Sequence, residues 1–324
     1  MKVLVIRFSS IGDIVLTSPV VRCLKLQRGA EIHYLTKKNF TAILSASPYI
    51  DRVHSIDKSL SEIIGVLKME DFDLIIDLHK NLRSWMVRRK LGKRSLTFQK
   101  ANVRKWLMVR FKPSDIKVDH IVNRYIHALK SLDVRYDGEG LDYFLQPAGE
   151  GIPVLSKPFL CFGIGGTHFT KRMPTHKIRE VCKNLSVPVY LLGGSEDTGA
   201  GEHIAQDFDH VSNLCGKLSI SDSARIIKEA SVVISHDTAI MHIAAAFNRP
   251  IVSIWGNTVP EFGMFPFYPE KEPAKFHVVQ VQDLPCRPCS KIGFNACPKG
   301  HFKCMIQQDT DYITDIAKLE ISNI

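Results

Sequence analysis

Short apolar runs alternate with segments of helical periodicity along the whole chain. In the first half, the runs at 2–8, 31–36, 52–56 and 72–78 have the length and composition of buried parallel strands. The segments at 14–27, 40–47 and 60–69 repeat apolar residues at helical spacing, and a further helix is expected at 119–132. This alternation predicts βαβ units, which build a parallel sheet covered by helices.

The second half repeats the pattern. Strands are expected at 159–163, 187–192, 232–235, 251–255 and 276–281, and helices at 175–185, 221–230, 239–247 and 310–319. Between the halves, the stretch 137–157 is rich in Gly and Pro, which is typical of a linker. We therefore predict an α/β protein with two domains, at 1–150 and 151–324.

The composition supports a globular protein. Of the 324 residues, 45% are hydrophobic and 23% are charged, so the chain is long enough for two buried cores. It contains no run of 18 apolar residues, so no membrane-spanning helix is expected. The first apolar run is too short for a signal peptide, and Arg7 interrupts it, so we expect a cytoplasmic protein.

Positive charge is concentrated in one segment. Twelve Lys and Arg residues and no Asp or Glu lie between residues 80 and 114, and this segment carries essentially the whole net charge of +10. It is either a solvated face or a surface for a polyanionic partner. Trp85, Trp106 and Phe111 lie within it, a mixture that also suits nucleic acid. The helical spacing of Trp106, Val109 and Arg110 favours aromatic residues that face the core over base stacking.

The turn after the first strand reads Ser9-Ser10-Ile11-Gly12-Asp13. It lacks the GxGxxG pattern of dinucleotide-binding proteins and offers a single carboxylate instead. Asp13 is either a helix-entry residue that interacts with the helix dipole or a general base. A carboxylate at this position can remove the proton of an attacking hydroxyl group.

Two turns of the second half suit phosphate groups. Glycines, a hydroxyl group and two cations follow the strand at 159–163, ahead of a helix that begins near Pro174, and such a set can hold a diphosphate. The ordinary alternative is a surface pair, Lys171 and Arg172. The turn at 236–238 leads into a helix, whose N-terminus attracts phosphate. Asp237 and Thr238 are also ordinary N-cap residues.

Four cysteines cluster near the C-terminus: Cys286, Cys289, Cys297 and Cys304. The first pair has the C-x₂-C spacing of zinc sites, whereas the second pair does not. The sequence therefore leaves two alternatives for these cysteines, a structural zinc site and ordinary thiols.

Two stretches carry a resemblance to a known family. KVLVIRFSSIGDIVLTSPVVRCLK at 2–25 and DTAIMHIAAAFNRPIVSIWG at 237–256 resemble the N-terminal and C-terminal signatures of glycosyltransferase family 9, the heptosyltransferases of lipopolysaccharide core synthesis. The two motifs occur in the family's order, and the likeness covers most of the chain. One departure is Ala239-Ile240, where the family usually has Gly-Pro or Gly-Leu.

The resemblance implies the glycosyltransferase B architecture, with two Rossmann-like domains facing a cleft and a C-terminal helix that crosses back to the first domain. It also implies inverting, metal-independent transfer of heptose from ADP-heptose to a lipid A/core oligosaccharide acceptor, with no required cofactor. Because such an acceptor is lipid-linked, we expect peripheral contact with the inner leaflet of the inner membrane and no nucleic-acid partner. The alternative is a nucleic-acid-binding protein that uses the basic segment and a zinc knuckle.

The resemblance and the spacing together nominate site residues in both halves. Asp13 and Lys171 are the expected catalytic residues, the first as general base. The expected donor-binding residues are Gly166, Thr167, Thr170, Arg172, Glu196, Asp237, Thr238, Ala239 and His242. Acceptor binding is expected from four cations of the basic segment: Lys80, Arg83, Arg88 and Arg89.

Overall fold

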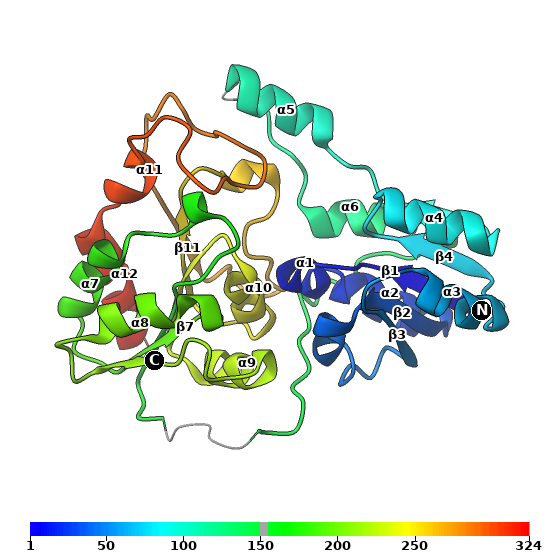
Figure 1. Cartoon of the computed structure of the whole chain (residues 1–324), viewed down its shortest axis with the longest axis horizontal. Helices are drawn as coiled ribbons and strands as arrows, with labels where there is room; N and C mark the ends of the chain where they lie inside the picture. The colour runs from blue at the N-terminus through cyan, green and yellow to red at the C-terminus, as the bar shows by residue number, and fades with distance from the viewer. Residues whose placement is uncertain (114, 150–154, 324) are drawn as a thin grey trace. The chain divides into compact units, whose positions relative to one another are not determined.

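A computed structural model describes residues 1–113, 115–149 and 155–323 (Figure 1). The chain forms two compact units. Unit 1 comprises Met1–Lys100, Asp119–Pro147 and Pro269–Lys271, and unit 2 comprises Ala101–Val118, Ala148–Tyr268 and Glu272–Ile324. The predicted boundary between residues 150 and 151 lies outside the described residues.

Unit 1 is built on a five-stranded parallel sheet in the order β3-β2-β1-β4-β5. Its strands are β1 (Lys2–Ile6), β2 (Glu31–Lys37), β3 (Arg52–Ile56), β4 (Leu74–Asp77) and β5 (Ser95–Thr97). Its helices are α1 (Ile11–Val15), α2 (Ser18–Arg28), α3 (Ser61–Met69), α4 (Leu82–Leu91) and α6 (Ile121–His127), with 3₁₀ turns η1 (Lys38–Ile43) and η2 (Lys130–Leu132). β4 is buried along its whole length, and so is β1 from Val3 onward, as expected for parallel strands covered on both faces.

Unit 2 is built on a six-stranded parallel sheet in the order β11-β10-β9-β6-β7-β8. Its strands are β6 (Leu160–Gly163), β7 (Val189–Leu192), β8 (Val211–Asn213), β9 (Val232–His236), β10 (Ile251–Trp255) and β11 (Phe276–Gln280). Its helices are α5 (Asn102–Phe111), α7 (Thr175–Lys183), α8 (Thr198–Ala205), α9 (Ile220–Glu229), α10 (Ala239–Ala246), α11 (Lys303–Ile306) and α12 (Thr310–Ser322). The 3₁₀ turns are η3 (Phe169–Lys171), η4 (Ser195–Asp197) and η5 (Pro260–Phe262).

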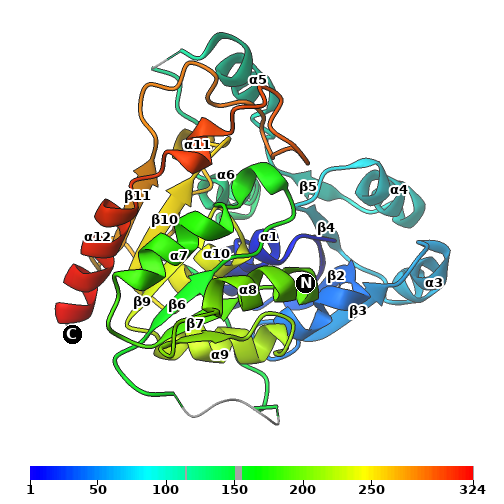
Figure 2. The same cartoon turned by 60° about the vertical axis from the view of Figure 1, so that its left-hand side comes forward.

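The core of unit 2 lies between its sheet and three helices. Apolar residues of α7, α8 and α12 pack against the inward side chains of β6, β7, β9 and β10. Figures 1 and 2 show these helices together over one face of the sheet, while α9 and α10 pack against each other on the opposite face. The predicted α/β class with two parallel sheets is therefore confirmed.

Two details of the prediction are wrong. The expected helix at 40–47 is a 3₁₀ turn, in which the hydroxyl groups of Thr41 and Ser45 bond to backbone carbonyls and compete with helical bonding. The final helix, α12, contributes Ile313, Ile316 and Ala317 to the core of unit 2. Trp106 does not face the core but is 53% exposed. Among the described residues, every helix is too short or too polar to cross a bilayer.

Candidate active site

The strand order of each unit marks one position where a ligand is expected. In an open parallel sheet, ligands bind beyond the carboxyl ends of the strands, where the strand order reverses. In unit 1 the order reverses between β1 and β4, and in unit 2 it reverses between β6 and β9. The segments that follow these four strands contain Asp13, Lys80, Gly166 and Asp237. The two sheets therefore bring most of the nominated residues to their two reversal points.

Asp13 is held by an ion pair at the reversal point of unit 1. Its Oδ1 lies 2.7 Å from Nη2 of Arg7, and its Oδ2 accepts hydrogen bonds from the backbone N (3.2 Å) and the hydroxyl (2.9 Å) of Ser10. Burial acts to raise the pKa of Asp13, but the Arg7 guanidinium and the Ser10 hydrogen bonds outweigh it and hold the pKa below its usual value. Asp13 is therefore an ionised, fixed carboxylate at neutral pH.

Arg7 is itself anchored from several sides. Its guanidinium donates to the carbonyl oxygens of Ser9 (2.8 Å) and Leu78 (2.7 Å) and to the hydroxyl of Tyr125 (3.0 Å). Leu78 directly follows β4, so Arg7 links the two loops of the reversal point. Because the guanidinium cannot move away, the carboxylate of Asp13 is fixed in orientation as well as charge.

His79 adds a neutral imidazole beside this carboxylate. Its ring packs edge to face with Phe8, and its Nδ1 is buried without a hydrogen-bond partner among the described residues. Burial, reinforced by repulsion from Arg7, lowers the pKa of His79 to about 4. The guanidinium of Arg83 lies 5.7 Å from the centre of the Phe8 ring, so this acceptor candidate lies close to the Asp13 group.

The other acceptor candidates differ in their surroundings. Arg88 Nε lies 3.1 Å from Oδ2 of the fully buried Asp77, so Arg88 has a structural ion pair. Lys80 donates to the carbonyl of Phe98 (3.0 Å) and remains partly exposed. Arg89 is exposed, with its guanidinium over the ring of Trp85. Lys80, Arg83 and Arg89 thus remain able to contact a ligand, whereas Arg88 stabilises the loop after β4.

At the reversal point of unit 2, Lys171 pairs with Asp237. Lys171 Nζ lies 2.6 Å from Oδ2 of Asp237 and 3.2 Å from its backbone oxygen, and the Thr258 hydroxyl donates to the same carboxylate at 2.9 Å. Burial acts to raise the pKa of Asp237, but Lys171, Thr258 and His242 hold it below its usual value. Asp237 therefore fixes the position of Lys171.

Arg172 lies beside this pair and crosses to the next strand. Its Nε donates to the carbonyl of Gly166 (2.5 Å), and its Nη1 lies 3.2 Å from Oδ1 of the buried Asp197, which follows β7. A Cβ atom at Gly166 would lie only 3.3 Å from Cγ2 of Thr238, so the loops after β6 and β9 run close together. Two cations and a small residue therefore share one edge of the sheet.

The N-terminus of α10 opens onto the same edge without a side-chain cap. Thr238 occupies the N-cap position, but its hydroxyl forms no bond to the helix and lies 3.2 Å from the hydroxyl of Ser235. Asp237 is engaged by Lys171. Ala239 is the first residue of the helix and does not have a positive φ, so its backbone conformation does not require glycine. The side chains of Asp237 and Thr238 therefore do not cap α10, which was the alternative raised by the sequence.

The remaining donor candidates vary in exposure. Glu196 lies in the exposed turn η4 after β7, and Thr167 is exposed in the loop after β6. His242 is buried on α10. Thr170 is also buried, and its hydroxyl exchanges hydrogen bonds with the backbone of Phe294 (3.2 and 2.9 Å). Thr170 therefore connects η3 to the cysteine-containing segment rather than facing outward.

The four cysteines lie near one another in unit 2. Burial raises the pKa of the Cys289 thiol, and Cys286, Cys304 and Cys297 raise it further because each would add negative charge nearby. Thiolates are the ligands that a thiophilic cation such as Zn²⁺ prefers, and a bound cation would relieve the repulsion between them. They are not, however, drawn together as a set of ligand atoms within 4.8 Å of one another.

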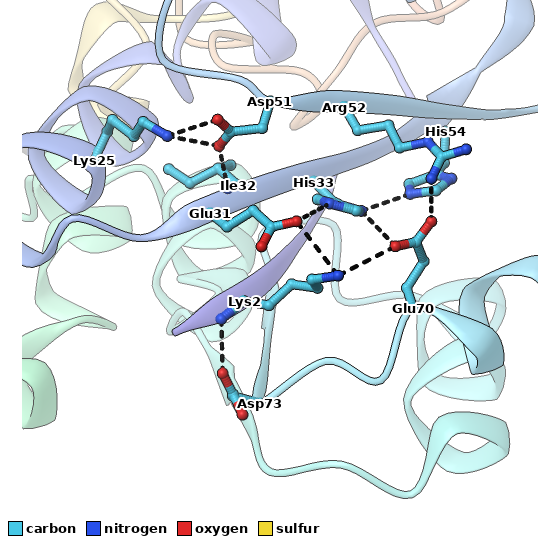
Figure 3. Close-up of polar contacts among 10 residues, drawn as sticks. All are labelled: Lys2, Lys25, Glu31, Ile32, His33, Asp51, Arg52, His54, Glu70 and Asp73. Atoms are coloured by element: carbon cyan, nitrogen blue, oxygen red, sulfur yellow. Dashed lines mark hydrogen bonds and ion pairs between the residues drawn. The ribbon is translucent and has the colours of Figure 1, made fainter.

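A different set does meet that spacing. His33, His54 and Glu70 lie together at the amino ends of the strands of unit 1 (Figure 3). The two rings bond directly at 2.9 Å, His33 bonds Glu31 at 3.0 Å, and the Glu70 carboxylate already pairs with Arg52 and Lys2. These polar groups satisfy one another and lie at the opposite end of the sheet from Asp13, which is typical of a stabilising network.

Four residues that lie at the two reversal points or bind groups there were not nominated from the sequence: Arg7, His79, Thr258 and Asp197. Each follows the carboxyl end of a strand, and Arg7 interrupts an otherwise apolar run. A polar residue that directly follows a predicted strand could therefore be nominated as a site residue from the sequence. Their partners are 6 to 71 residues away in the sequence, so only the fold shows the pairing.

Known proteins resemble the whole chain. Lipopolysaccharide heptosyltransferase 1 of Campylobacter coli is 24% identical over 290 residues, covering 80% of this chain and 84% of that protein. The enzyme of the same name from Pseudomonas aeruginosa is 26% identical over 317 residues, covering 90% and 86%. The solved structure of the E. coli ADP-heptose lps heptosyltransferase II matches with a TM-score of 0.74 and 20% identity, covering 100% of this chain and 99% of that chain. This likeness confirms the expected glycosyltransferase B fold class.

The sequence model of glycosyltransferase family 9 (heptosyltransferase) matches residues 62–293, which include β4, all the donor candidates and the first two clustered cysteines. The nucleic-acid alternative has no support in these comparisons. The chain belongs to glycosyltransferase family 9 and is a sugar-transferring enzyme.

Proposed function

We propose that this enzyme transfers heptose, with inversion, from ADP-heptose to a lipid-linked core oligosaccharide. The observation that carries the proposal is the pair of reversal points: one holds an ionised carboxylate fixed by Arg7, and the other holds fixed cations beside an uncapped helix N-terminus. The related proteins named above are lipopolysaccharide heptosyltransferases, and one solved relative is named for ADP-heptose. We assign acceptor binding to the predicted domain 1–150 and donor binding to 151–324.

In the proposed reaction, Asp13 acts as general base. An acceptor hydroxyl group attacks the anomeric carbon as its proton passes to the Asp13 carboxylate, and the bond between that carbon and the diphosphate oxygen breaks. The electron pair of that bond leaves with ADP. Attack from the face opposite the leaving group inverts the configuration. Arg7 keeps the carboxylate ionised and oriented before the hydroxyl arrives.

The unit 2 residues stabilise the departing diphosphate. Lys171, Arg172 and the amides at the start of α10 supply positive charge where negative charge develops. Glu196 is exposed after β7 and is suited to accept hydrogen bonds from ribose hydroxyl groups. This set neutralises the leaving group with the chain's own cations, so we propose that transfer needs no metal cofactor.

We assign acceptor phosphate groups to Lys80, Arg83 and Arg89, and we place the enzyme in the cytoplasm at the inner leaflet of the inner membrane. Arg88 pairs with buried Asp77, so we propose that it holds the loop after β4 in place for these three residues. The segment between residues 80 and 114 carries no acidic residue, which suits both a phosphorylated acceptor and anionic lipid.

A structural metal ion at the cysteines is a separate proposal. Cys286, Cys289 and Cys297 lie in a stretch without regular secondary structure, and Cys304 lies on α11. An ion held by the four thiolates would cross-link this stretch to the helix and would take no part in the transfer.

Nucleotide-sugar specificity tests the central proposal. A ligand that binds only the folded state raises the melting temperature, so ADP-heptose should raise it more than UDP-glucose, UDP-N-acetylglucosamine or GDP-mannose at equal concentration. Glu196→Ala should reduce the shift, and Asp13→Asn should retain it. A larger shift with a uridine or guanosine sugar would reject ADP-heptose as the donor.

A further inference from the structure

Helix α5 of unit 2 is weakly amphipathic and turns several apolar side chains outward. One stripe of the helix, at i, i+3, i+4 and i+7 spacing, consists of Lys105, Met108, Val109 and Lys112. This stripe faces the protein: Met108 packs with Val118 and Phe262, and Val109 packs against them. The two lysines also point inward, since Lys105 Nζ lies 5.4 Å from the centre of the Phe262 ring and Lys112 donates to the carbonyl oxygens of Val109 and Pro288.

The opposite face of α5 is exposed and carries three large apolar side chains. Val103 is 71% exposed, Trp106 is 53% exposed and Phe111 is 65% exposed, and the Trp106 and Phe111 rings pack edge to face at 5.9 Å. Leu107, between them on the helix surface, is half-buried. A helix of a soluble monomer ordinarily turns such residues inward, so a contiguous outward patch of this kind marks an interaction surface.

The charges around this patch indicate its partner. Arg104 and Arg110 are exposed on the same face as these apolar residues, and the Arg110 guanidinium lies 5.7 Å from the centre of the Phe111 ring. No acidic residue occurs between residues 80 and 114. Tryptophan and phenylalanine prefer the boundary between lipid headgroups and acyl chains, and arginine side chains pair with anionic headgroups. A nucleic-acid partner would account for the arginines, and a protein partner would account for the exposed apolar residues. An anionic bilayer accounts for both.

We propose that α5 is the membrane-docking element of this enzyme and lies in the interface of an anionic bilayer, with Val103, Trp106 and Phe111 inserted among the acyl chains and Arg104 and Arg110 at the headgroups. The inference rests on the proposed function in that a lipid-linked acceptor must be met at a membrane. It differs from general attraction by the basic segment, because insertion is hydrophobic and persists at high salt, whereas attraction of exposed charges is screened.

The test compares the parent protein with Val103→Gln/Trp106→Gln/Phe111→Gln in flotation with vesicles of phosphatidylcholine and phosphatidylglycerol. The triple variant should bind roughly tenfold or more weakly, since it loses three inserted side chains. The matched control, Ile306→Gln/Tyr312→Gln/Leu319→Gln, removes three exposed apolar residues of α11 and α12 and should bind like the parent. Arg104→Gln/Arg110→Gln should weaken binding mainly at low salt. Equal binding by the parent and the α5 triple variant would overturn the proposal.

Fluorescence quenching provides a second readout that does not depend on folding defects. Phosphatidylcholine with bromine on its acyl chains should quench the emission of vesicle-bound parent, and Trp106→Phe should retain vesicle binding while losing most of the quenching. Trp255 is fully buried and contributes a constant background, whereas Trp85 of α4 is 45% exposed, so both proteins are compared in a Trp85→Phe background. Unquenched Trp106 in bound protein would place α5 outside the bilayer and overturn the proposal. If the α5 triple substitution abolished self-association of the chain but left vesicle binding unchanged, the exposed apolar residues would serve a second copy of the chain. That result would also overturn the proposal.

Transfer assays separate this inference from the proposed function. With an acceptor embedded in vesicles, the α5 triple variant should be slower than the parent, whereas with a deacylated, water-soluble acceptor the two should be equal. If the parent transfers no heptose to either acceptor, the proposed function fails while the vesicle experiments still decide the role of α5. Equal slowing with both acceptors would show that α5 acts on catalysis and not on docking, which contradicts the inference.

Discussion

At the scale of single residues, both candidate catalytic groups are held by an opposite charge. Arg7 holds Asp13 ionised, and Asp237 holds Lys171 beside the start of α10. Each partner is supported by further hydrogen bonds, so the reactive groups are positioned before any substrate binds. Such preorganisation spares the reaction the cost of reorganising charges, which is the main way in which fixed groups stabilise a transition state.

Replacing the proposed base tests its role directly. Asp13→Asn should reduce the rate of transfer by roughly 10²–10⁴-fold, the usual contribution of a positioned base, and leave the binding of the nucleotide sugar unchanged. Steady-state kinetics and donor titration measure the two effects separately. A variant that turns over at nearly the parent rate would remove Asp13 from the mechanism.

The partner of Asp13 should control the pH dependence of the reaction. The pKa of Asp13 lies below its usual value, so the active carboxylate persists well into the acid range and is lost as the pH falls through that pKa. Arg7→Gln removes the positive charge that counteracts the effect of burial, so the pKa of Asp13 should rise. The acid limb of the kcat/KM profile should therefore move to higher pH. An unmoved acid limb would show that another group controls it.

Removing Lys171 should affect stability and catalysis in separable ways. Lys171→Met leaves the Asp237 carboxylate buried without its cation and should lower the free energy of unfolding by roughly 3 kcal/mol. Lys171→Met/Asp237→Asn removes both charges and should recover much of that stability, measured by denaturant titration, without recovering activity. Recovery of activity in the double variant would show that the lysine serves only the ion pair.

Two neighbouring arginines of α4 should behave differently. Arg88→Gln leaves buried Asp77 without its ion pair and should destabilise the protein by roughly 2–3 kcal/mol. Arg89 is exposed, so Arg89→Gln should change the free energy of unfolding by less than about 0.5 kcal/mol while raising the acceptor KM. Equal destabilisation by the two variants would mean that the Asp77 pair is not what holds Arg88.

At the scale of elements, the sequence predicts strands and long helices well because their periodicity is local. β5 and β8 have three residues each, too few for a pattern, and neither was predicted. For α5 the period is correct but Trp106 is on the wrong face: helical spacing groups Trp106 with Val109 and Arg110, whereas Met108 and Val109 pack against Phe262. Which stripe is covered depends on a partner more than 150 residues away, and no local signal carries that information.

The cysteine-containing stretch makes an element-scale prediction. If the four thiolates hold a metal ion, Cys286→Ser/Cys289→Ser should lose the metal and melt at a lower temperature, because binding energy at such a site is also folding energy. Metal analysis of the purified protein and melting curves with and without chelator measure both. The control is Cys161→Ala, a buried cysteine of β6, which should keep the metal content of the parent. Metal-free parent protein with an unchanged melting temperature in chelator would refute the site.

At the scale of the whole molecule, the order of strands explains why the candidate residues can be found from sequence at all. Both sheets reverse their strand order once, and the loops at these reversals contain the family motifs. The motifs therefore identify the site by position. What they omit are the partners that fix each group, such as Arg7 and Thr258, since these pairings arise only when distant strands become neighbours.

The most direct test of the account is transfer itself. Purified enzyme, ADP-heptose and a lipid-linked core acceptor without its heptose residues should give a product heavier by one heptosyl residue in mass spectrometry, with release of ADP. Asp13→Asn under the same conditions should give little product. If no nucleotide sugar yields transfer to this acceptor, or if Asp13→Asn transfers as fast as the parent, the central claim is contradicted.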